Sequence, residues 1–322
     1  MAEAPLEVRG LVKHYGEIVA VDNVDLTVDE GAVYGYLGPN GAGKTTSLRM
    51  MLGLIRPTAG SVRLFGRDPQ AGVAALERVA GFVEEPRFYP YMSGRRNLEL
   101  LADFDGGGAR ERIDEVLNVV ELADRAKDRV RGYSHGMRQR LGIGAALLRA
   151  PRLLLLDEPT TGLDPAGMRD MRSLVRRLAG SGMTVVLSSH LLGEVEELCD
   201  RVAIIRTGRV VYEGTIAELK RTAAGAYRLR TTDDARAIDV CRVQPGIDGA
   251  RRTAGTIHFT AGEGAVAGLS AALVEAGAPP VELTPEAASL EALFFSLTED
   301  RDGTPAEPAP DTGGAEPVGE PA

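Results

Sequence analysis

A glycine-rich segment between an apolar run and a helical pattern constrains this chain more than any other feature. Residues 38–45 read Gly-Pro-Asn-Gly-Ala-Gly-Lys-Thr and fit the pattern G-x-x-x-x-G-K-[ST]. Residues 32–37 form an apolar, strand-like run before it, and a helical pattern begins near Lys44. Glycine lets the backbone curl until successive N–H groups point inward, and the helix N-terminus adds its positive dipole end. The segment therefore predicts a phosphate-binding loop, the alternative being a glycine-rich turn with a solvated lysine.

The side chains of this loop have separate predicted roles toward a bound nucleotide. Lys44 neutralises the β- and γ-phosphates, and the hydroxyl of Thr45 coordinates Mg²⁺. These roles make ATP and Mg²⁺ the predicted cofactors. The predicted nucleotide-binding residues of the loop are Gly38, Pro39, Asn40, Gly41, Ala42, Gly43, Lys44, Thr45 and Thr46.

Strand and helix patterns alternate over the first 220 residues or so. Alternation of this kind predicts a mostly parallel sheet with covering helices, and so an α/β fold. The run 153–156 is four consecutive leucines, as expected for a strand buried on both faces. The remaining strand-like runs are 79–83 and 183–187, and the helical patterns are 43–54, 135–149 and 165–179.

Two adjacent carboxylates, Asp157 and Glu158, follow the run of leucines. Ligands of α/β sheets bind at the carboxyl ends of strands, where successive side chains project in different directions. We therefore predict that Asp157 holds Mg²⁺ and that Glu158 acts as the general base for a water molecule. Taken alone, Asp-Glu-Pro after apolar residues is more often a capped turn. The phosphate-binding loop upstream favours the catalytic interpretation.

Composition excludes several other classes of protein. Two cysteines are too few for a disulfide framework, and the first residues lack the basic and then apolar pattern of a secretory leader. No window approaches the roughly 20 apolar residues that a membrane-spanning helix needs. The formal charge of −9 argues against a nucleic-acid partner, because clustered Lys and Arg bind phosphate backbones. We therefore expect a protein of the reducing cytoplasm with no transmembrane segment.

The chain after residue 220 divides into a small domain and a tail. Strand and helix patterns there predict a βαββαβ unit, with a hairpin partner at 251–254 and a closing amphipathic helix at 288–297. This α+β domain is predicted to span residues 221–300. Residues 303–322 hold five prolines, four carboxylates and no Lys or Arg, so the tail 301–322 is predicted to be disordered. The expected strands are 227–231, 256–260 and 281–283, and the expected helices are 235–243 and 266–275.

Several ordered motifs together resemble the ATP-binding subunits of ABC transporters, over about residues 5–220. Residues 133–141, Tyr-Ser-His-Gly-Met-Arg-Gln-Arg-Leu, are similar to the signature segment of that family. The resemblance implies a P-loop ABC ATPase cassette over residues 1–220, with a helical signature subdomain at about 85–150. It also implies that Ser134 and Gly136 contact the γ-phosphate held by a partner subunit. A plain helix N-cap is the alternative for Ser134.

Other positions match the family one by one. Residues 161–164, Thr-Gly-Leu-Asp, resemble its D-loop, which implies a nucleotide contact for Asp164. His190, after an apolar strand, resembles its switch histidine, which orients the γ-phosphate and has a structural hydrogen bond as its alternative. Tyr15 matches the aromatic residue that stacks on adenine, although an isolated tyrosine is more often a core or edge residue.

The chain departs from the common family pattern at two places. Glu84 stands where most members have a glutamine that links the γ-phosphate and Mg²⁺ to the membrane partner. Glutamate keeps an acceptor and loses a donor. Its charge would strengthen contact with the metal and repel the γ-phosphate, so we expect Glu84 to keep the coupling role with an altered dependence on Mg²⁺. In the signature segment, His135 and Met137 replace a Gly and a Gln of the commoner form.

The resemblance implies an ATPase that works as a pair. A single phosphate loop and a single signature segment require a second copy of the chain, packed head to tail, with each ATP sandwiched between the two. Because no segment of the sequence is predicted to span a membrane, we expect the substrate pathway to lie in a separate transmembrane permease. We therefore expect a peripheral protein at the cytoplasmic face of the membrane.

The segments 84–86 and 87–96, with the variant signature, resemble the branch that exports drugs and antibiotics, including self-resistance exporters. The segment 85–96 carries Phe88, Tyr89 and Tyr91 and is the predicted docking groove for a permease helix, with an ordinary core cluster as the alternative. The transported molecule does not follow from the resemblance. The alternative functions are a soluble, non-transport ABC ATPase, whose second cassette or long coiled coil this chain lacks, and a nucleotide-sensing regulatory module.

Overall fold

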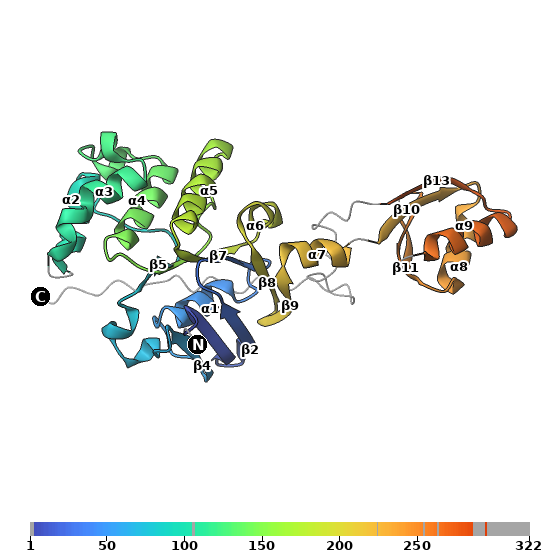
Figure 1. Ribbon diagram of the computed structural model, residues 1–322, viewed down its shortest axis with the longest axis horizontal. Helices are drawn as coiled ribbons and strands as arrows, with labels where there is room; N and C mark the ends of the chain where they lie inside the picture. The colour runs from blue at the N-terminus through green and yellow to red at the C-terminus, as the bar shows by residue number, and fades with distance from the viewer. Residues whose placement is uncertain are drawn as a thin grey trace, which may run out of the picture.

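The computed structural model of the protein describes residues 3–104, 107–223, 225–253, 255–262 and 264–285, together with Phe294. Its strands form three sheets, and the largest of them lies at the centre of the N-terminal part (Figure 1). Among the helices of these residues, none is both long and apolar enough to cross a lipid bilayer.

A six-stranded sheet confirms the predicted α/β class. Its order is β5-β6-β7-β3-β8-β9, with parallel neighbours from β5 to β8 and β9 antiparallel at the edge. Leu153 and Leu155 join one apolar core and Leu154 and Leu156 join another, as the two faces of a covered strand require. The strands are β3 (Val33–Leu37), β5 (Val79–Phe82), β6 (Leu153–Leu156), β7 (Thr184–Ser189), β8 (Arg201–Arg206) and β9 (Arg209–Thr215).

A three-stranded antiparallel sheet and the first helix cover one face. Leu6 and Val8 of β1 and Leu48 of α1 share a core with Leu153 and Leu155. The order of this sheet is β2-β1-β4. Its strands are β1 (Leu6–Tyr15), β2 (Ile18–Val28) and β4 (Ala59–Leu64), and the helix is α1 (Lys44–Met51).

Helices cover the other face, where Leu154 and Leu156 share a core with Leu141 of α4, Leu174 of α5 and Val195 of α6. Figure 1 shows α2, α3 and α4 as one helical group beside β5, within the expected range of about 85–150. The helices are α2 (Gly94–Phe104), α3 (Ile113–Val119), α4 (His135–Leu147), α5 (Pro165–Gly180) and α6 (Leu192–Leu198).

Beyond α7 (Ile216–Ala223), the chain forms the predicted βαββαβ unit with the sheet order β11-β12-β10-β13. Leu229, Ile257 and Leu269 belong to a core of its own. The hairpin partner begins earlier than expected, because β11 already pairs with β12 at Ile247. The elements are β10 (Ala226–Thr231), α8 (Asp234–Val243), β11 (Ile247–Thr253), β12 (Thr256–Ala261), α9 (Ala265–Glu275) and β13 (Pro280–Pro285).

The expected helix at 288–297 and the expected tail at 301–322 lie outside the described residues, apart from Phe294. Phe294 is buried and belongs to the core that holds Ile216 and Leu219 of α7. It does not join the core of the βαββαβ unit, which the prediction of a closing helix for that unit required. Phe294 itself is helical, as expected, and its ring packs in the core that holds α7.

Candidate nucleotide-binding site

The site lies where the carboxyl ends of three neighbouring parallel strands meet. The phosphate loop follows β3, Glu158 follows β6 and His190 follows β7, and these strands are consecutive in the sheet. Leu37 pairs with Ser189 in register, and the N–H of Gly38 donates to the carbonyl of Ser189 at 3.2 Å. Parallel strands thus bring together segments that are more than 100 residues apart in the chain.

Two glycines of the loop are required by close packing of the backbone. A Cβ atom on Gly38 would lie 2.4 Å from the carbonyl oxygen of Ile205. On Gly43, which has a φ of 101°, it would lie 2.3 Å from the carbonyl oxygen of Ala20. No other residue fits either place, because real Cβ atoms do not approach an oxygen so closely. The loop therefore keeps the curled form that a phosphate requires.

Lys44 lies under the loop with its ammonium nearly buried, at 4% exposure of the side chain. Its Nζ donates to the carbonyl oxygens of Gly38 at 2.9 Å and Pro39 at 3.1 Å. It also lies 3.2 Å from Oε1 of Glu158. The ammonium is therefore held at the place where a phosphate in the loop would sit.

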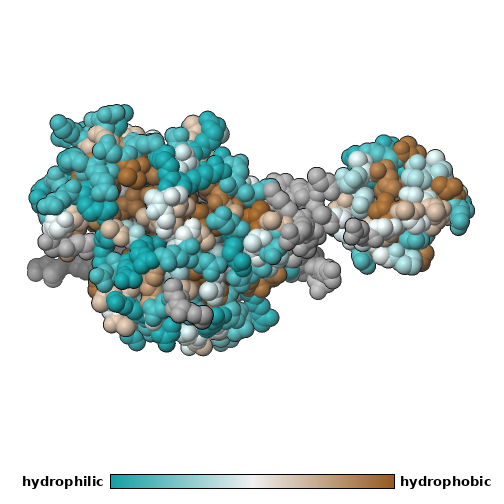
Figure 2. All heavy atoms as spheres, in the orientation of Figure 1, coloured by the Kyte–Doolittle hydropathy of each residue, from teal (hydrophilic) through white to brown (hydrophobic). Residues whose placement is uncertain are grey.

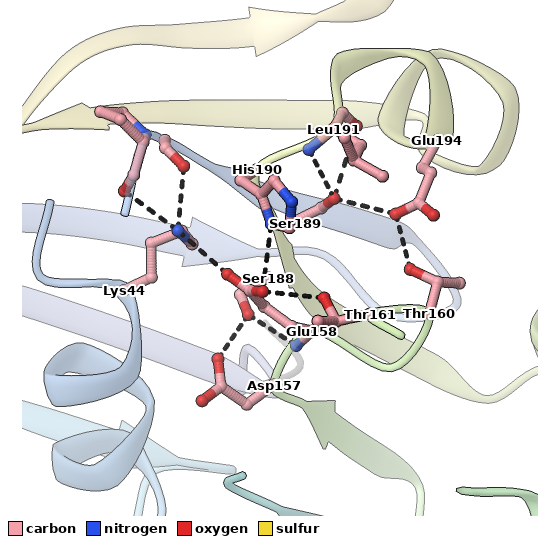
Figure 3. Close-up of polar contacts among 12 residues, drawn as sticks. Lys44, Asp157, Glu158, Thr160, Thr161, Ser188, Ser189, His190, Leu191 and Glu194 are labelled. Carbon is pink, nitrogen blue, oxygen red and sulfur yellow. Dashed lines mark hydrogen bonds and ion pairs between the residues drawn. The ribbon is translucent and has the colours of Figure 1, made fainter. Parts of the chain in front are cut away.

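Glu158 connects the lysine to the histidine (Figure 3). Its Oε2 lies 3.1 Å from Nδ1 of His190 and accepts from the hydroxyl of Thr161 at 2.8 Å. Because a carboxylate only accepts, Nδ1 of His190 is the donor in this contact. Glu158 has a φ of 43°, a left-handed backbone conformation that is uncommon for residues other than glycine. The strained turn aims its carboxylate between Lys44 and His190.

The surroundings of Glu158 keep it ionised. Burial raises the pKa of its carboxyl, but the hydrogen bond from Thr161 and the charge of Lys44 outweigh that effect and hold the pKa below the usual glutamate value. His190 lowers it further. A carboxylate in this state can accept a proton or a hydrogen bond from water at neutral pH.

The residues around this pair include several that the sequence patterns did not single out. Ser188 donates to Oδ1 of Asp157 at 2.5 Å and accepts from the N–H of Glu158 at 2.9 Å. The buried Glu194 accepts from the hydroxyls of Thr160 at 2.7 Å and Ser189 at 2.9 Å. The two adjacent serines at the end of an apolar strand were the available signal for Ser188 and Ser189. Glu194 gave none, because only the fold brings it to Thr160.

A cavity of about 600 Å³ opens over the loop. Tyr15 lies at its rim, about half exposed, with the ammonium of Lys13 5.1 Å from the ring centroid. Such an aromatic face can stack on a purine base. Ala42 is buried below, where its carbonyl accepts from the N–H of Gly208. The lining residues are Tyr15, Ile18, Val19, Ala20, Asn40, Gly41, Gly43, Lys44, Thr45, Thr46, Arg49 and Glu158.

The predicted metal-binding residues carry hard oxygen donors. Asp157 is buried, and Thr45 lines the cavity. Within the described residues, no three His, Cys, Asp or Glu side chains cluster as a metal site of their own. That donor set fits Mg²⁺, which takes one or two carboxylates together with phosphate oxygens and water. Glu84, with a φ of 69°, directs its exposed carboxylate to the guanidinium of Arg49.

The signature residues Ser134 and Gly136 and the predicted Asp164 stand at the starts of two helices. The described residues that line the cavity do not include Ser134, Gly136 or Asp164. Ser134 caps α4 by accepting from the N–H of Met137 at 3.2 Å, and Asp164 caps α5 by accepting from Gly167 at 2.9 Å. A Cβ on Gly136 would make only an ordinary contact, 3.6 Å from Leu163. Packing within this chain therefore does not require glycine at 136.

Comparison with known proteins identifies the family that the sequence motifs resemble. The family model described as "ABC transporter" matches residues 21–161. The bacitracin transport ATP-binding protein BcrA of Bacillus licheniformis is 39% identical over 290 residues, which cover 89% of this chain and 95% of that protein. The daunorubicin/doxorubicin resistance ATP-binding protein DrrA of Streptomyces peucetius is 42% identical over 234 residues, 71% of each chain. The alignment with BcrA thus extends well beyond the cassette.

Solved structures agree on the fold. An ATP-binding subunit of an ABC transporter superposes with a TM-score of 0.60 at 29% identity, covering 67% of this chain and 92% of that chain. A cassette solved as a dimer, in a post-hydrolysis state with ADP and phosphate, gives a TM-score of 0.59 at 26% identity. It covers 66% of this chain and 98% of that one. The expected cassette fold is therefore confirmed, with a further C-terminal region in this chain.

Proposed function

Because this chain belongs to the ATP-binding subunits of ABC transporters, related to those of antibiotic and drug exporters, we propose that its ATPase activity drives export of a drug or antibiotic through a separate membrane permease. One observation carries the assignment of the site. Glu158, whose backbone has a left-handed conformation, places its carboxylate between the ammonium of Lys44 and the imidazole of His190.

In the proposed reaction, Glu158 positions and deprotonates the attacking water. The ammonium of Lys44 lies 3.2 Å from Oε1 of Glu158. The β- and γ-phosphates of ATP then compete for the same ammonium, which frees Oε1 to accept a proton from water. His190 stays on Oε2 and orients the carboxylate. The loop N–H groups and Lys44 stabilise the charge of the transferred phosphoryl group, so the chain contributes positioning and electrostatics.

Mg²⁺ would be held by Asp157 and the hydroxyl of Thr45, together with phosphate oxygens, and would supply further neutralisation of phosphate charge. Ser188 keeps the Asp157 carboxylate in place by donating to its Oδ1, which leaves Oδ2 for water or metal. Glu84 is proposed to reach the same region, and it would have to leave Arg49 to do so.

We propose that the working form is a head-to-tail pair of this chain. Ser134 and Gly136, at the start of α4, do not line the cavity, and in this proposal a second copy supplies them to the phosphate loop. Glycine at 136, where this chain's packing would accept a side chain, fits the close approach of a partner's phosphate. Asp164 is proposed to contact nucleotide across the same interface.

The permease is proposed to dock on segment 85–96, at the cytoplasmic face of the membrane. Tyr89 and Tyr91 are largely exposed there and contact each other, with ring centroids 5.8 Å apart. On the face seen in Figure 2, apolar surface also lies around α4 amid hydrophilic side chains. Exposed aromatic residues of this kind are typical of protein contact sites. Tyr89→Ala with Tyr91→Ala should abolish co-sedimentation with the permease, and unchanged recruitment contradicts the docking site.

The test of the proposed function is Glu158→Gln. The variant keeps hydrogen bonding to His190 but cannot take a proton, so it should bind ATP, stop turning over and accumulate as a dimer in size-exclusion chromatography with ATP. Glu275→Gln, at an exposed glutamate of α9, is the matched control and should behave as the parent. A Glu158→Gln chain that hydrolyses ATP at the parental rate, or that stays monomeric at saturating ATP, refutes the proposal.

A further inference from the structure

His135 is the residue of the signature segment for which neither the cavity nor the proposed reaction accounts. It is the first residue of α4, next to the cap residue Ser134, and its side chain is 30% exposed. Instead of facing solvent, the imidazole reaches two other segments of the same chain.

Both ring nitrogens face hydrogen-bond acceptors. Nε2 lies 3.0 Å from the carbonyl oxygen of Thr161, and Nδ1 lies 3.3 Å from Oε1 of Glu85. Because a carbonyl oxygen only accepts, Nε2 is the donor in the contact with Thr161, while Nδ1 lies beside the carboxylate of Glu85. Arg138, one turn along α4, also approaches Oε1 of Glu85 at 3.4 Å. The start of α4 is thus connected to the loop after β6 and to the segment after β5.

The contact with Thr161 leads to the catalytic carboxylate. The backbone carbonyl of Thr161 accepts from His135, while its hydroxyl donates to Oε2 of Glu158 at 2.8 Å. The next residue, Gly162, turns with a φ of 76°, and a Cβ there would lie 3.4 Å from Nε2 of His135. The ring therefore fills the inside of this turn and holds the residue whose side chain orients Glu158.

We propose that His135 is a positioning residue for ATP hydrolysis, which acts through Thr161 on Glu158 and connects that loop to Glu85 in the proposed permease-docking segment. The inference rests on the proposed role of Glu158. It makes the start of the signature helix part of its own subunit's hydrolysis site. Movement of segment 85–96 can then reach Thr161 through one side chain.

Two isosteric variants separate the two contacts. In His135→Gln, the side-chain amide nitrogen lies near the position of the histidine Nε2 and can still donate to the carbonyl of Thr161. In His135→Asn, the side-chain amide nitrogen lies near the position of the histidine Nδ1 and can still donate to Glu85. We expect the kcat of the purified full-length chain to stay within about twofold for Gln and to fall about fivefold for Asn and for His135→Gly, with KM for ATP nearly unchanged. Equal kcat values for Gln and Asn overturn the proposal.

A double-mutant cycle tests whether His135 acts through Thr161. Thr161→Val removes the hydroxyl that orients Glu158, so His135→Gly should have almost no further effect on kcat in that background. A purely structural role predicts that the two effects multiply, and that outcome overturns the proposal. Thermal unfolding of each variant comes first, and His135→Ala replaces the glycine variant if that variant unfolds early.

The parent and Lys44→Ala distinguish failure of this inference from failure of the proposed function. A parent that hydrolyses ATP, with an inactive Lys44→Ala, leaves the proposed site standing whatever the cycle gives. If the parent is active and the effects of His135→Gly and Thr161→Val on kcat multiply, only the role of His135 is overturned. A parent without ATPase activity overturns both.

Discussion

The buried carboxylate of Glu194 should support the site through two hydroxyl groups, and its substitution tests how. Oε2 accepts from Thr160 and from Ser189, whereas Oε1 is buried and has no hydrogen-bond partner in the described structure. Thr160 lies two residues after Glu158, and Ser189 lies just before His190. Glu194→Ala removes the oxygen that accepts from both hydroxyls, while Glu194→Gln keeps an oxygen for them and also removes a buried charge.

The size of the effect follows from these contacts. Glu194 is 3% exposed, so each lost hydrogen bond to its charged group is worth about 1.5–3 kcal/mol. With two such bonds lost, we expect Glu194→Ala to lower the free energy of unfolding by about 3–6 kcal/mol. For Glu194→Gln we expect a cost of about 1–2 kcal/mol, because the amide N–H₂ group takes the place of the unpartnered oxygen and needs acceptors itself.

Urea unfolding followed by circular dichroism measures both free energies, with Glu275→Gln as the control for loss of an exposed carboxylate. Steady-state ATPase assays at a temperature where all variants are folded should show that kcat falls more in Glu194→Ala than in Glu194→Gln. If Glu194→Gln costs as much stability as Glu194→Ala, the buried charge and not the pair of hydroxyl contacts supports the site, and the reasoning is refuted.

Three further outcomes follow from the geometry of the site. Gly43→Ala should abolish binding of a fluorescent ATP analogue, because its Cβ would lie 2.3 Å from the carbonyl oxygen of Ala20, and retained binding would contradict the packing argument. Tyr15→Ala should weaken ATP binding about tenfold in titration calorimetry while kcat at saturation is unchanged, with Tyr15→Phe as the control that keeps the ring. The pKa of the Glu158 carboxyl is lowered in the folded chain, so its contribution to stability is present above the unfolded pKa and is lost as the pH falls through the folded value. Thr161→Val raises that folded pKa, so the acid limb of kcat should move to higher pH, and an unmoved limb would show that Thr161 does not act on Glu158.

Local patterns of the sequence were sufficient to predict the strands and helices of the site and several of its individual residues. Four consecutive leucines predicted a strand covered on both faces, and they do belong to two different cores. The glycines at 38 and 43 marked the loop because no other residue fits there, and Ser134 does cap a helix. Spacing and residue type mark these features in the sequence, although the atoms that exclude a side chain at 38 and 43 belong to Ile205 and Ala20.

Contacts between distant segments were decided only by the tertiary structure. The fold brings Lys44, Glu158 and His190 together because their strands are neighbours in the sheet, and the order of strands is not a property of any single segment. The same holds for Glu194 on Thr160 and for His135 on Thr161. Chain connectivity determines which residues can form a helix or a loop. Packing of the sheet determines which side chains from distant segments form hydrogen bonds or ion pairs and which line the same cavity.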